Sequence, residues 1–238
     1  MRKSSFYLGI VFVVCSVLSV NDARADSHTY YNPNWASGYA TAHYNTPYGS
    51  GNGQNPFHDY SSLSDGGNCT NFVSQAIIAG MDNTQTMSTI YTDRVNFDID
   101  ANGGVYRWYY RSDADRGPAF TSANKLHEYA VYNVPANKGL HFQYITSDTL
   151  TSFMNYQIVQ YGDIIFADWD HNGTVDHSMI VTRFDWFQPG YNKIRVTYQG
   201  RPGVVGVTDI GLGDVNELYK YQAIFSVYRP VDYNPLGL

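Results

Sequence analysis

Residues 66–75 read Gly66-Gly67-Asn68-Cys69-Thr70-Asn71-Phe72-Val73-Ser74-Gln75, and they predict a buried helix that begins at a cysteine. Its apolar face consists of Phe72, Val73, Ala76 and Ile77, which recur at helical spacing over residues 69–79. Asn68 is expected to cap the start of this helix and Gly80 its end. A helix with such a face must pack against a second layer, so we expect the fold to be organised around it.

The beginning of the chain has the pattern of an export signal, and we expect residues 1–25 to be cleaved off as a signal peptide. The pattern consists of the basic Arg2 and Lys3, an apolar run over residues 6–20 and the small-x-small site Ala23-Arg24-Ala25. An uncleaved membrane anchor is disfavoured, because a spanning helix needs about 20 apolar residues. We therefore expect a protein that is secreted or periplasmic and that has no membrane contact after cleavage.

Cleavage also removes Cys15, so Cys69 becomes the single cysteine of a mature chain over residues 26–238. An unpaired thiol is unusual in an exported protein, because oxidising compartments favour disulfides. A chemical role for Cys69 is the natural explanation. On the residue alone, however, a small buried residue of the core is the more common case.

Composition and charge narrow the class of protein. The mature chain is of a size that forms one domain, and we expect a monomer. Without the signal peptide, 12 basic and 20 acidic side chains remain, which is a net charge of −8. Such a surface repels nucleic acid and anionic membranes, so neither is expected as a partner. The 22 tyrosines, 12 phenylalanines and 4 tryptophans should lie mostly in the core, with a minority able to stack on sugar rings or peptide side chains.

The order of the expected elements indicates an α+β fold in which the cysteine helix packs across an antiparallel sheet. Further helices are expected over residues 34–44, 122–132 and 147–156. Strands are expected over residues 163–168, 177–184, 193–199 and 221–228, where apolar and β-branched residues dominate between turns. Residues 81–120 are polar and irregular, and we expect them to form an insertion or a lid.

A nucleophilic thiol needs assistance, because its ordinary pKa of about 8.5 leaves it mostly protonated at neutral pH. Cys69 lies in the first turn of its helix, where free N–H groups and the helix dipole favour a thiolate. Among seven histidines, His177 opens a strand directly after an acidic turn, and its side chain can project from the sheet toward the helix start. These two residues predict a thiolate–imidazolium pair. The alternative is a structural cysteine and a structural histidine.

A resemblance now becomes specific. Residues 68–75 resemble the Asp-Cys-Thr-Asn-Phe-Val-Ser-Gln signature of the bacterial putative amidase domain family (amidase family six), which is related to papain-like, NlpC-type cell-wall peptidases. Three further segments match that family in the same order. They are Tyr31-Asn32 followed by residues 36–42, then Gly162-Asp163-Ile164-Ile165, then Asp176-His177-Ser178-Met179-Ile180-Val181-Thr182.

The resemblance implies a papain-like fold with Cys69 as the nucleophile and His177 as the base. The chain departs from the family pattern at two positions. Asn68 stands where the family usually has an aspartate, which removes a charge beside the thiol. Gln199 stands where a polar partner of the histidine is expected, and its amide oxygen would accept a hydrogen bond from the imidazole. Asn192 is the alternative for that role.

Charge develops on the carbonyl oxygen during acyl transfer, and donors must stabilise it. The backbone N–H of Cys69 is the expected first donor, because it lies at the helix start. The second donor is expected from the side chain of Asn68 or from Tyr60. For Asn68 the alternative role is a helix cap, and for Tyr60 it is packing.

Residues 168–176 have the spacing of a calcium-binding loop. The expected ligands are Asp168, Asp170, Asn172, Thr174 and Asp176, with Gly173 at the sharp turn. The bidentate glutamate that closes such loops is absent, because Met179 occupies its position. The alternative is an ordinary hairpin turn, which Asn172-Gly173 also favours. If calcium binds, we expect it to stiffen the chain before His177 and to be structural, since the chemistry itself requires no cofactor.

Taken together, these features predict an exported cysteine hydrolase that cleaves an amide or peptide bond, with peptidoglycan as the expected substrate. One alternative is a calcium-stabilised module that binds a glycan or peptide on a papain-like scaffold without catalysis. Another is an acyltransferase that passes the acyl group to an amine.

Overall fold

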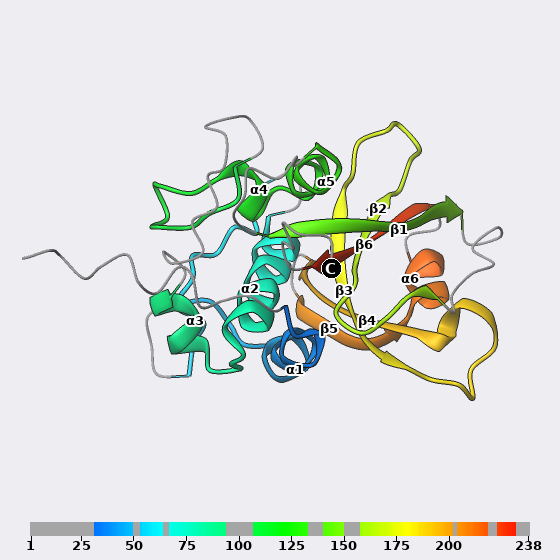
Figure 1. The fold of residues 1–238 in the computed structure, drawn as a ribbon, viewed down its shortest axis with the longest axis horizontal. Coiled ribbons are helices and arrows are strands. Elements are labelled where there is room, and N and C mark those ends of the chain that lie inside the picture. The colour runs from blue at the N-terminus through cyan, green and yellow to red at the C-terminus, as the bar shows by residue number, and fades with distance from the viewer. Residues whose placement is uncertain are drawn as a thin grey trace, which may run out of the picture.

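Six antiparallel strands form one twisted and curved sheet, and helices cover both of its faces (Figure 1). The computed structural model describes residues 31–49, 53–63, 67–93, 107–132, 140–149, 158–201, 204–218 and 223–231. The expected signal peptide lies outside these residues. The α+β class expected from the sequence is confirmed.

The sheet has the order β1-β6-β2-β3-β4-β5. The strands are β1 (His141–Thr149), β2 (Ile164–Asp168), β3 (His177–Phe184), β4 (Ile194–Arg201), β5 (Val204–Gly211) and β6 (Ile224–Val231). Strands β2 to β5 follow one another as a meander, and β6 returns to pair with the free edge of β2. The expected strands correspond to β2, β3, β4 and β6, whereas β1 and β5 were not expected.

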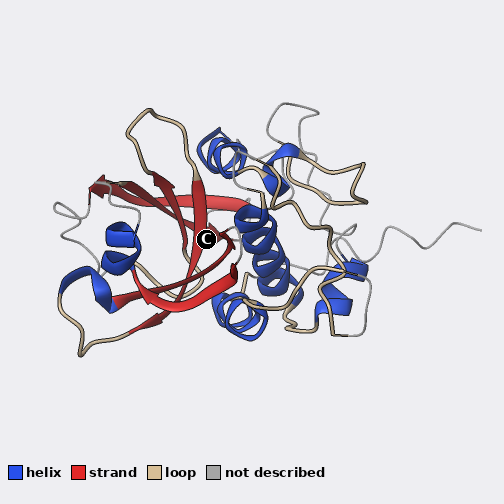
Figure 2. Ribbon diagram, turned by 180° about the vertical axis from the view of Figure 1, so that it is seen from behind, coloured by secondary structure: helices blue, strands red, loops and turns tan. Residues whose placement is uncertain are grey.

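The apolar residues of β2 divide between two core clusters because neighbouring side chains of a strand point to opposite faces. Ile164 and Phe166 belong to the cluster under the large helices. Ile165 and Ala167 belong to the cluster on the other face, where α6 (Leu212–Leu218) packs. Figure 2 shows α6 on the opposite side of the sheet from the large helices. Both faces of β2 are therefore buried, which explains its continuous apolar sequence.

The helix α2 (Asn68–Asp82) lies at the centre of the helical layer, and its residues 68–80 are all buried. It packs against α1 (Pro33–His43) and against β3 and β4. Two expectations about its ends are wrong. Gly67, with φ 54°, precedes the helix at the position expected for Asn68, and Asn83 in the left-handed conformation ends it. Gly80 lies inside the helix instead, where an added Cβ would come within 2.5 Å of the ring of Tyr31.

Two further helices were expected, over residues 122–132 and 147–156. The first corresponds to α5 (Ala123–Tyr132), and the second overlaps the strand β1. The start of α5 is confirmed, since the Ser122 hydroxyl accepts a hydrogen bond from the N–H of Lys125 at 3.3 Å. The helix expected over residues 147–156 is wrong at its beginning, because residues 147–149 pair with β6 as part of β1. Its remaining residues lie outside the described part of the chain.

Much of the segment expected as an insertion or lid belongs to the core. Its described residues include α3 (Met87–Asp93) and the start of α4 (Pro118–Thr121). Trp108, Tyr110 and Phe120 are each at most 2% exposed and share a cluster with Cys69. The indole N–H of Trp108 also donates to the hydroxyl of Ser74 on α2 at 3.0 Å. Trp108, Tyr110 and Phe120 therefore belong to the core beside α2, whereas residues 111–115 are exposed; residues 94–106 lie outside the described residues.

Among the described residues, none of the helices combines the length and the apolar character needed to cross a bilayer.

Candidate active site

Cys69 lies in the first turn of α2, completely buried between that helix and the sheet. The sharp turn before it requires glycine, because a Cβ on Gly67 would come within 2.4 Å of the carbonyl oxygen of Tyr60. On the sheet side, the backbone at Gly200 lies against the helix start. A Cβ at Gly200 would stand 2.8 Å from the backbone nitrogen of Cys69. Two glycines thus allow the close approach that places the thiol.

The imidazole of His177 lies within hydrogen-bonding reach of the Cys69 thiol. His177 is the first residue of β3 and is 7% exposed. Burial acts most strongly on the thiol and raises its pKa, but the charge of His177 and hydrogen bonds from His177, Thr70 and the Ser178 N–H together lower that pKa to about 7. The structure therefore brings together the two residues that the sequence predicted as a pair.

Two aromatic rings hold the imidazole in place. The ring of Tyr198 stands at 90° to that of His177 with centroids 4.7 Å apart, and the ring of Trp169 lies 6.0 Å away. Neither residue was predicted from the sequence. Both flank predicted residues, since Trp169 lies in the acidic loop and Tyr198 precedes Gln199, but their type alone does not distinguish them from core aromatics.

We expected Gln199 to bind the imidazole of His177, but its side chain makes its hydrogen bonds to other groups. Its amide oxygen accepts a hydrogen bond from the hydroxyl of Tyr48. Its amide nitrogen donates to the carbonyl oxygens of His43 at 3.1 Å and Tyr44 at 2.9 Å, where α1 ends. Because Tyr198 and Gln199 point to opposite faces of β4, the residue that contacts the imidazole is Tyr198. Gln199 instead ties the end of α1 to the strand beside the thiol.

Asn192, the alternative to Gln199, is also remote from this role. It lies in the short helix η3 (Gly190–Lys193), beyond the end of β3 opposite to His177. Its amide exchanges two hydrogen bonds of 3.0 Å with Asp214, one through the side chain and one through the backbone N–H. Asn192 therefore fixes the start of α6.

The side chains of Asn68 and Tyr60 are engaged in the loop before α2. The amide oxygen of Asn68 accepts from the Tyr60 N–H at 2.7 Å, and its amide nitrogen donates to the Asp59 carboxylate at 2.6 Å. The hydroxyl of Tyr60 donates to the carboxylate of Asp113 at 2.8 Å. Neither side chain contacts the thiol through these bonds, so the structure does not bring them together as oxyanion donors. Both side chains therefore have structural roles. Tyr60 packs in the core, and Asn68 anchors the loop before α2 rather than capping the helix.

Tyr48 is a residue of the site that sequence reasoning missed. Burial is the largest of several influences that raise the pKa of its phenol, and the charges of Tyr39, Asp59 and Cys69 act in the same direction. Its hydroxyl donates to the amide oxygen of Gln199, on the strand beside the thiol. The segment around Tyr48 is rich in Gly, Asn and Pro, and no periodic pattern marked this tyrosine.

The Gly162-Asp163 segment of the family signature serves the fold. The buried carboxylate of Asp163 makes two bonds with the guanidinium of Arg229, at 2.8 and 2.9 Å. Burial nevertheless raises the pKa of that carboxyl above its ordinary value. Gly162 allows α1 to approach, since its Cβ would lie 2.6 Å from the Cβ of Pro33.

The acidic loop brings three carboxylates together immediately before His177. Oxygen atoms of Asp168, Asp170 and Asp176 all lie within 4.8 Å of one another. The N–H groups of Asn172 and Gly173 donate to Asp168 at 3.2 and 2.9 Å, which folds the loop around that carboxylate. Burial, followed by smaller effects that include repulsion from Asp170 and Asp168, raises the pKa of Asp176. Clustered carboxylates are the ligand type that Ca²⁺ prefers.

The comparison with protein families agrees with this geometry. No curated protein and no solved structure matches the chain significantly. A family model described as a putative amidase domain matches residues 30–217, a range that includes both Cys69 and His177. That range covers most of the 238 residues. The chain therefore belongs to the putative amidase domain family.

Proposed function

We propose that this protein is an exported cysteine amidohydrolase in which Cys69 is the nucleophile and His177 the general base and acid. The observation that carries the proposal is the His177 imidazole at the start of β3, within hydrogen-bonding reach of the thiol at the start of α2; its proximity lowers the thiol pKa although the thiol is buried. A thiol that only fills the core would have its pKa raised by burial. Family membership supports amide hydrolysis as the reaction.

The reaction would proceed through an acyl-enzyme. The Cys69 sulfur attacks the amide carbonyl carbon, and the backbone N–H of Cys69 donates to the oxygen that becomes negative. The C–N bond then breaks, and His177 passes its proton to the departing amine. A water molecule gives a proton back to His177 and attacks the thioester, which releases the carboxylic acid and restores the thiolate.

The fold that we infer is papain-like. A helix that begins at the nucleophile packs across an antiparallel sheet, and the base stands at the start of a neighbouring strand. The α+β class alone does not demand this arrangement, so the inference depends on the positions of Cys69 and His177 within it.

The substrate that we propose is a peptide amide of peptidoglycan, either between stem-peptide residues or at the muramoyl–peptide link. The signal-like N-terminus would place the enzyme where this polymer occurs, and the net charge of −8 after cleavage favours an enzyme that diffuses rather than one held on a polyanionic wall. We propose that it acts as a monomer.

Purified sacculi and soluble peptide amides provide the test. The wild-type protein should release new amino groups and the matching carboxylates, identified by mass spectrometry of the products. Cys69→Ala should reduce this release to background without lowering the thermal midpoint by more than a few degrees. Turnover that persists in Cys69→Ala would reject the mechanism. Thr41→Ala, an exposed change on α1, is the matched control and should retain full activity.

We also propose a structural calcium ion at the acidic loop, held by Asp168, Asp170 and Asp176 with oxygen atoms of Asn172 and Thr174. The convergence of three carboxylates supports it. Because the loop leads directly into β3, the ion would fix the backbone that presents His177.

A further inference from the structure

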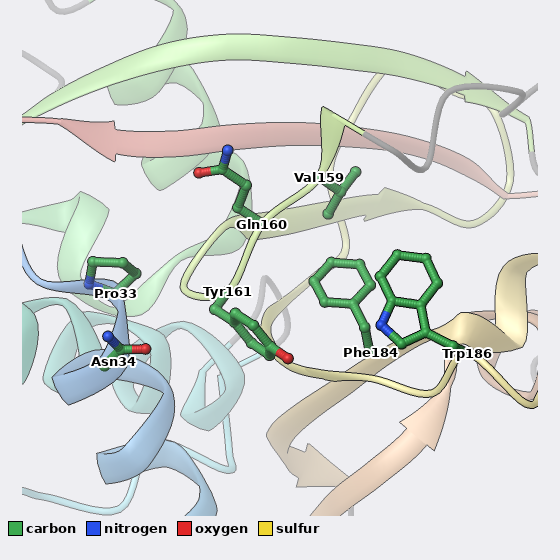
Figure 3. A pocket seen from close by; sticks show the side chains of 7 residues that line it. All are labelled: Pro33, Asn34, Val159, Gln160, Tyr161, Phe184 and Trp186. Carbon is green, nitrogen blue, oxygen red and sulfur yellow. The ribbon is translucent and has the colours of Figure 1, made fainter.

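A pocket of about 300 Å³ lies at the opposite end of β3 from His177. It is formed between the first turn of α1, the residues that precede β2 and the end of β3 (Figure 3). With about 3.3 Å per residue, the seven steps from His177 to Phe184 span roughly 23 Å along β3. The pocket is therefore not part of the candidate active site.

Three aromatic rings form a continuous apolar wall of this pocket. Phe184 stands in the middle, with the ring of Tyr161 edge-on at 5.2 Å and the ring of Trp186 stacked at 5.7 Å. Trp186 is 63% exposed and Tyr161 is 41% exposed. Clustered aromatic surface that remains exposed to water marks a binding site more often than isolated apolar residues do.

The chain after β3 holds Trp186 in a fixed turn. The backbone N–H of Asp185 donates to the carbonyl oxygen of Lys193 at 2.8 Å. The carboxylate of Asp185 accepts from the N–H of Phe187 at 3.2 Å. A ring that is positioned before binding loses little conformational entropy when a ligand stacks on it.

Two residues with side-chain amides line the pocket beside the rings. Asn34 and Gln160 line it, and their side-chain amides make no hydrogen bond to any other residue that the structure describes. None of the lining residues carries a charge. A charged ligand would lose its hydration without gaining a counter-charge, so the lining favours a neutral ligand.

We propose that this pocket binds one ring of a neutral oligosaccharide. A pyranose offers an apolar C–H face to the aromatic wall and hydroxyl groups to the free amides of Asn34 and Gln160. The volume lies at the lower end of the roughly 300–1,000 Å³ of small-molecule sites. A stable protein partner would need about 800 Å² of contact surface, far more than one small pocket presents.

This binding is independent of the thiol chemistry. It would hold a saccharide at a second point on the molecule, so that a glycan-bearing polymer is retained between cleavage events. Failure of Cys69 to act as a nucleophile would leave the proposal intact, and failure of the pocket to bind would leave the amidase proposal intact.

Isothermal titration of the full mature chain carrying Cys69→Ala tests the proposal, with chitotriose and cellotriose as probes. At least one trisaccharide should bind saturably. Trp186→Ala should weaken that binding about tenfold, because it removes both apolar contact and ring stacking. Gln160→Ala should weaken it severalfold. Phe187→Ala is the matched control, since Phe187 is 98% exposed, neighbours Trp186 and does not line the pocket. This variant should bind the trisaccharide with unchanged affinity.

Three results of the binding measurements would overturn the proposal. They are no saturable binding of either trisaccharide, equal affinity in the parent, Trp186→Ala and Gln160→Ala, and equal weakening by Phe187→Ala. Circular dichroism of each variant shows whether a loss reflects unfolding, and Gln160→Ala, an exposed side chain, remains informative if Trp186→Ala fails to fold. Self-association that Trp186→Ala abolishes would identify a second copy of the chain as the occupant and would also reject the saccharide.

Discussion

At Cys69, burial and the neighbouring imidazole act on the thiol in opposite directions, and the imidazole together with two further groups, Thr70 and the Ser178 N–H, brings the pKa to about 7. A thiol with its ordinary pKa of about 8.5 would hold roughly thirtyfold less thiolate at pH 6. The lowered pKa of Cys69 makes the stability of the folded protein depend on pH. Since the folded-state pKa is the lower one, this group adds stability as the pH rises above 7 and loses that contribution as the pH falls through 7.

We predict that replacing His177 separates these influences. The ultraviolet absorbance of the thiolate should titrate with a midpoint near pH 7 in the wild-type protein. In His177→Ala, burial remains while the imidazole is lost, so the midpoint should move above the ordinary thiol value of about 8.5. Cys69→Ala should show no titration and supplies the baseline. A midpoint that stays near 7 in His177→Ala would show that the helix start alone stabilises the thiolate.

Replacing Gln199 distinguishes the role expected from the sequence from the one its contacts indicate. Gln199→Ala leaves the carbonyl oxygens of His43 and Tyr44 and the Tyr48 hydroxyl without their buried partner. We expect a loss of about 1–3 kcal/mol in the free energy of unfolding, measured by urea titration. The thiolate midpoint should not change, because Tyr198 and Trp169 still hold the imidazole. A shifted midpoint without loss of stability would restore Gln199 as the partner of His177.

The sequence predicted the reacting residues better than the residues that support them. Cys69 and His177 lie at the starts of a helix and a strand, positions that periodicity and turn residues reveal. The partners of Gln199, Asn68 and Tyr60 depend instead on which face of β4 meets α1 and on how the loop before α2 folds back. Those choices are made by tertiary packing, and side-chain amides and hydroxyls accept many partners of similar energy.

Among the elements, the approach of β4 to the start of α2 determines where the thiol lies. Gly200 has φ 103°, and its missing side chain leaves room for the backbone of Cys69. The strand pattern of β3 and β4 was readable because buried apolar residues lie on both faces of β3 and at every second position of β4. β1 was misread because residues 147–149 begin with Ser147, which resembles a helix cap, and its pairing with β6 is a contact over about 80 residues that local propensity does not contain.

We predict that Gly200→Ala damages activity more than its backbone strain explains. The added Cβ would stand 2.8 Å from the Cys69 nitrogen, so either the strand or the helix start must move. Amide hydrolysis should fall at least tenfold, because misplacement by about 1 Å at a reacting group has effects of this size. Gly190→Ala is the matched control: it also has a positive φ, 56°, but its Cβ would meet nothing within 4 Å. That control should lose about 1 kcal/mol of stability and no activity. Equal activity in both variants would mean that the contact between Gly200 and Cys69 is unimportant.

For the whole molecule, β3 connects the acidic loop, the candidate active site and the aromatic pocket. It begins at His177, directly after the acidic loop, and ends at the aromatic pocket around Phe184. The α+β architecture and the central helix were predictable from the order of apolar segments. The participation of Trp108 and Tyr110 in the core was not, because both are buried by partners from α2 and the loop before it rather than by any local periodic pattern.

Calcium should act on the stability of the whole molecule rather than on the reaction itself. An ion that binds only the folded protein with a dissociation constant near about 1 mM, as weak extracellular sites do, would add about 1.4 kcal/mol at roughly 10 mM Ca²⁺. For a chain of this size we expect the thermal midpoint to rise by about 3–6 °C, and chelation to reverse the rise. Mg²⁺ at the same concentration controls for ionic strength and should have a smaller effect, because it favours octahedral sites with retained water. Asp170→Asn weakens the carboxylate cluster at an exposed position and should abolish the calcium-dependent part of the shift. If calcium and magnesium raise the midpoint equally, or if Asp170→Asn keeps the full shift, the loop is an ordinary turn whose Asn172-Gly173 geometry needs no ion.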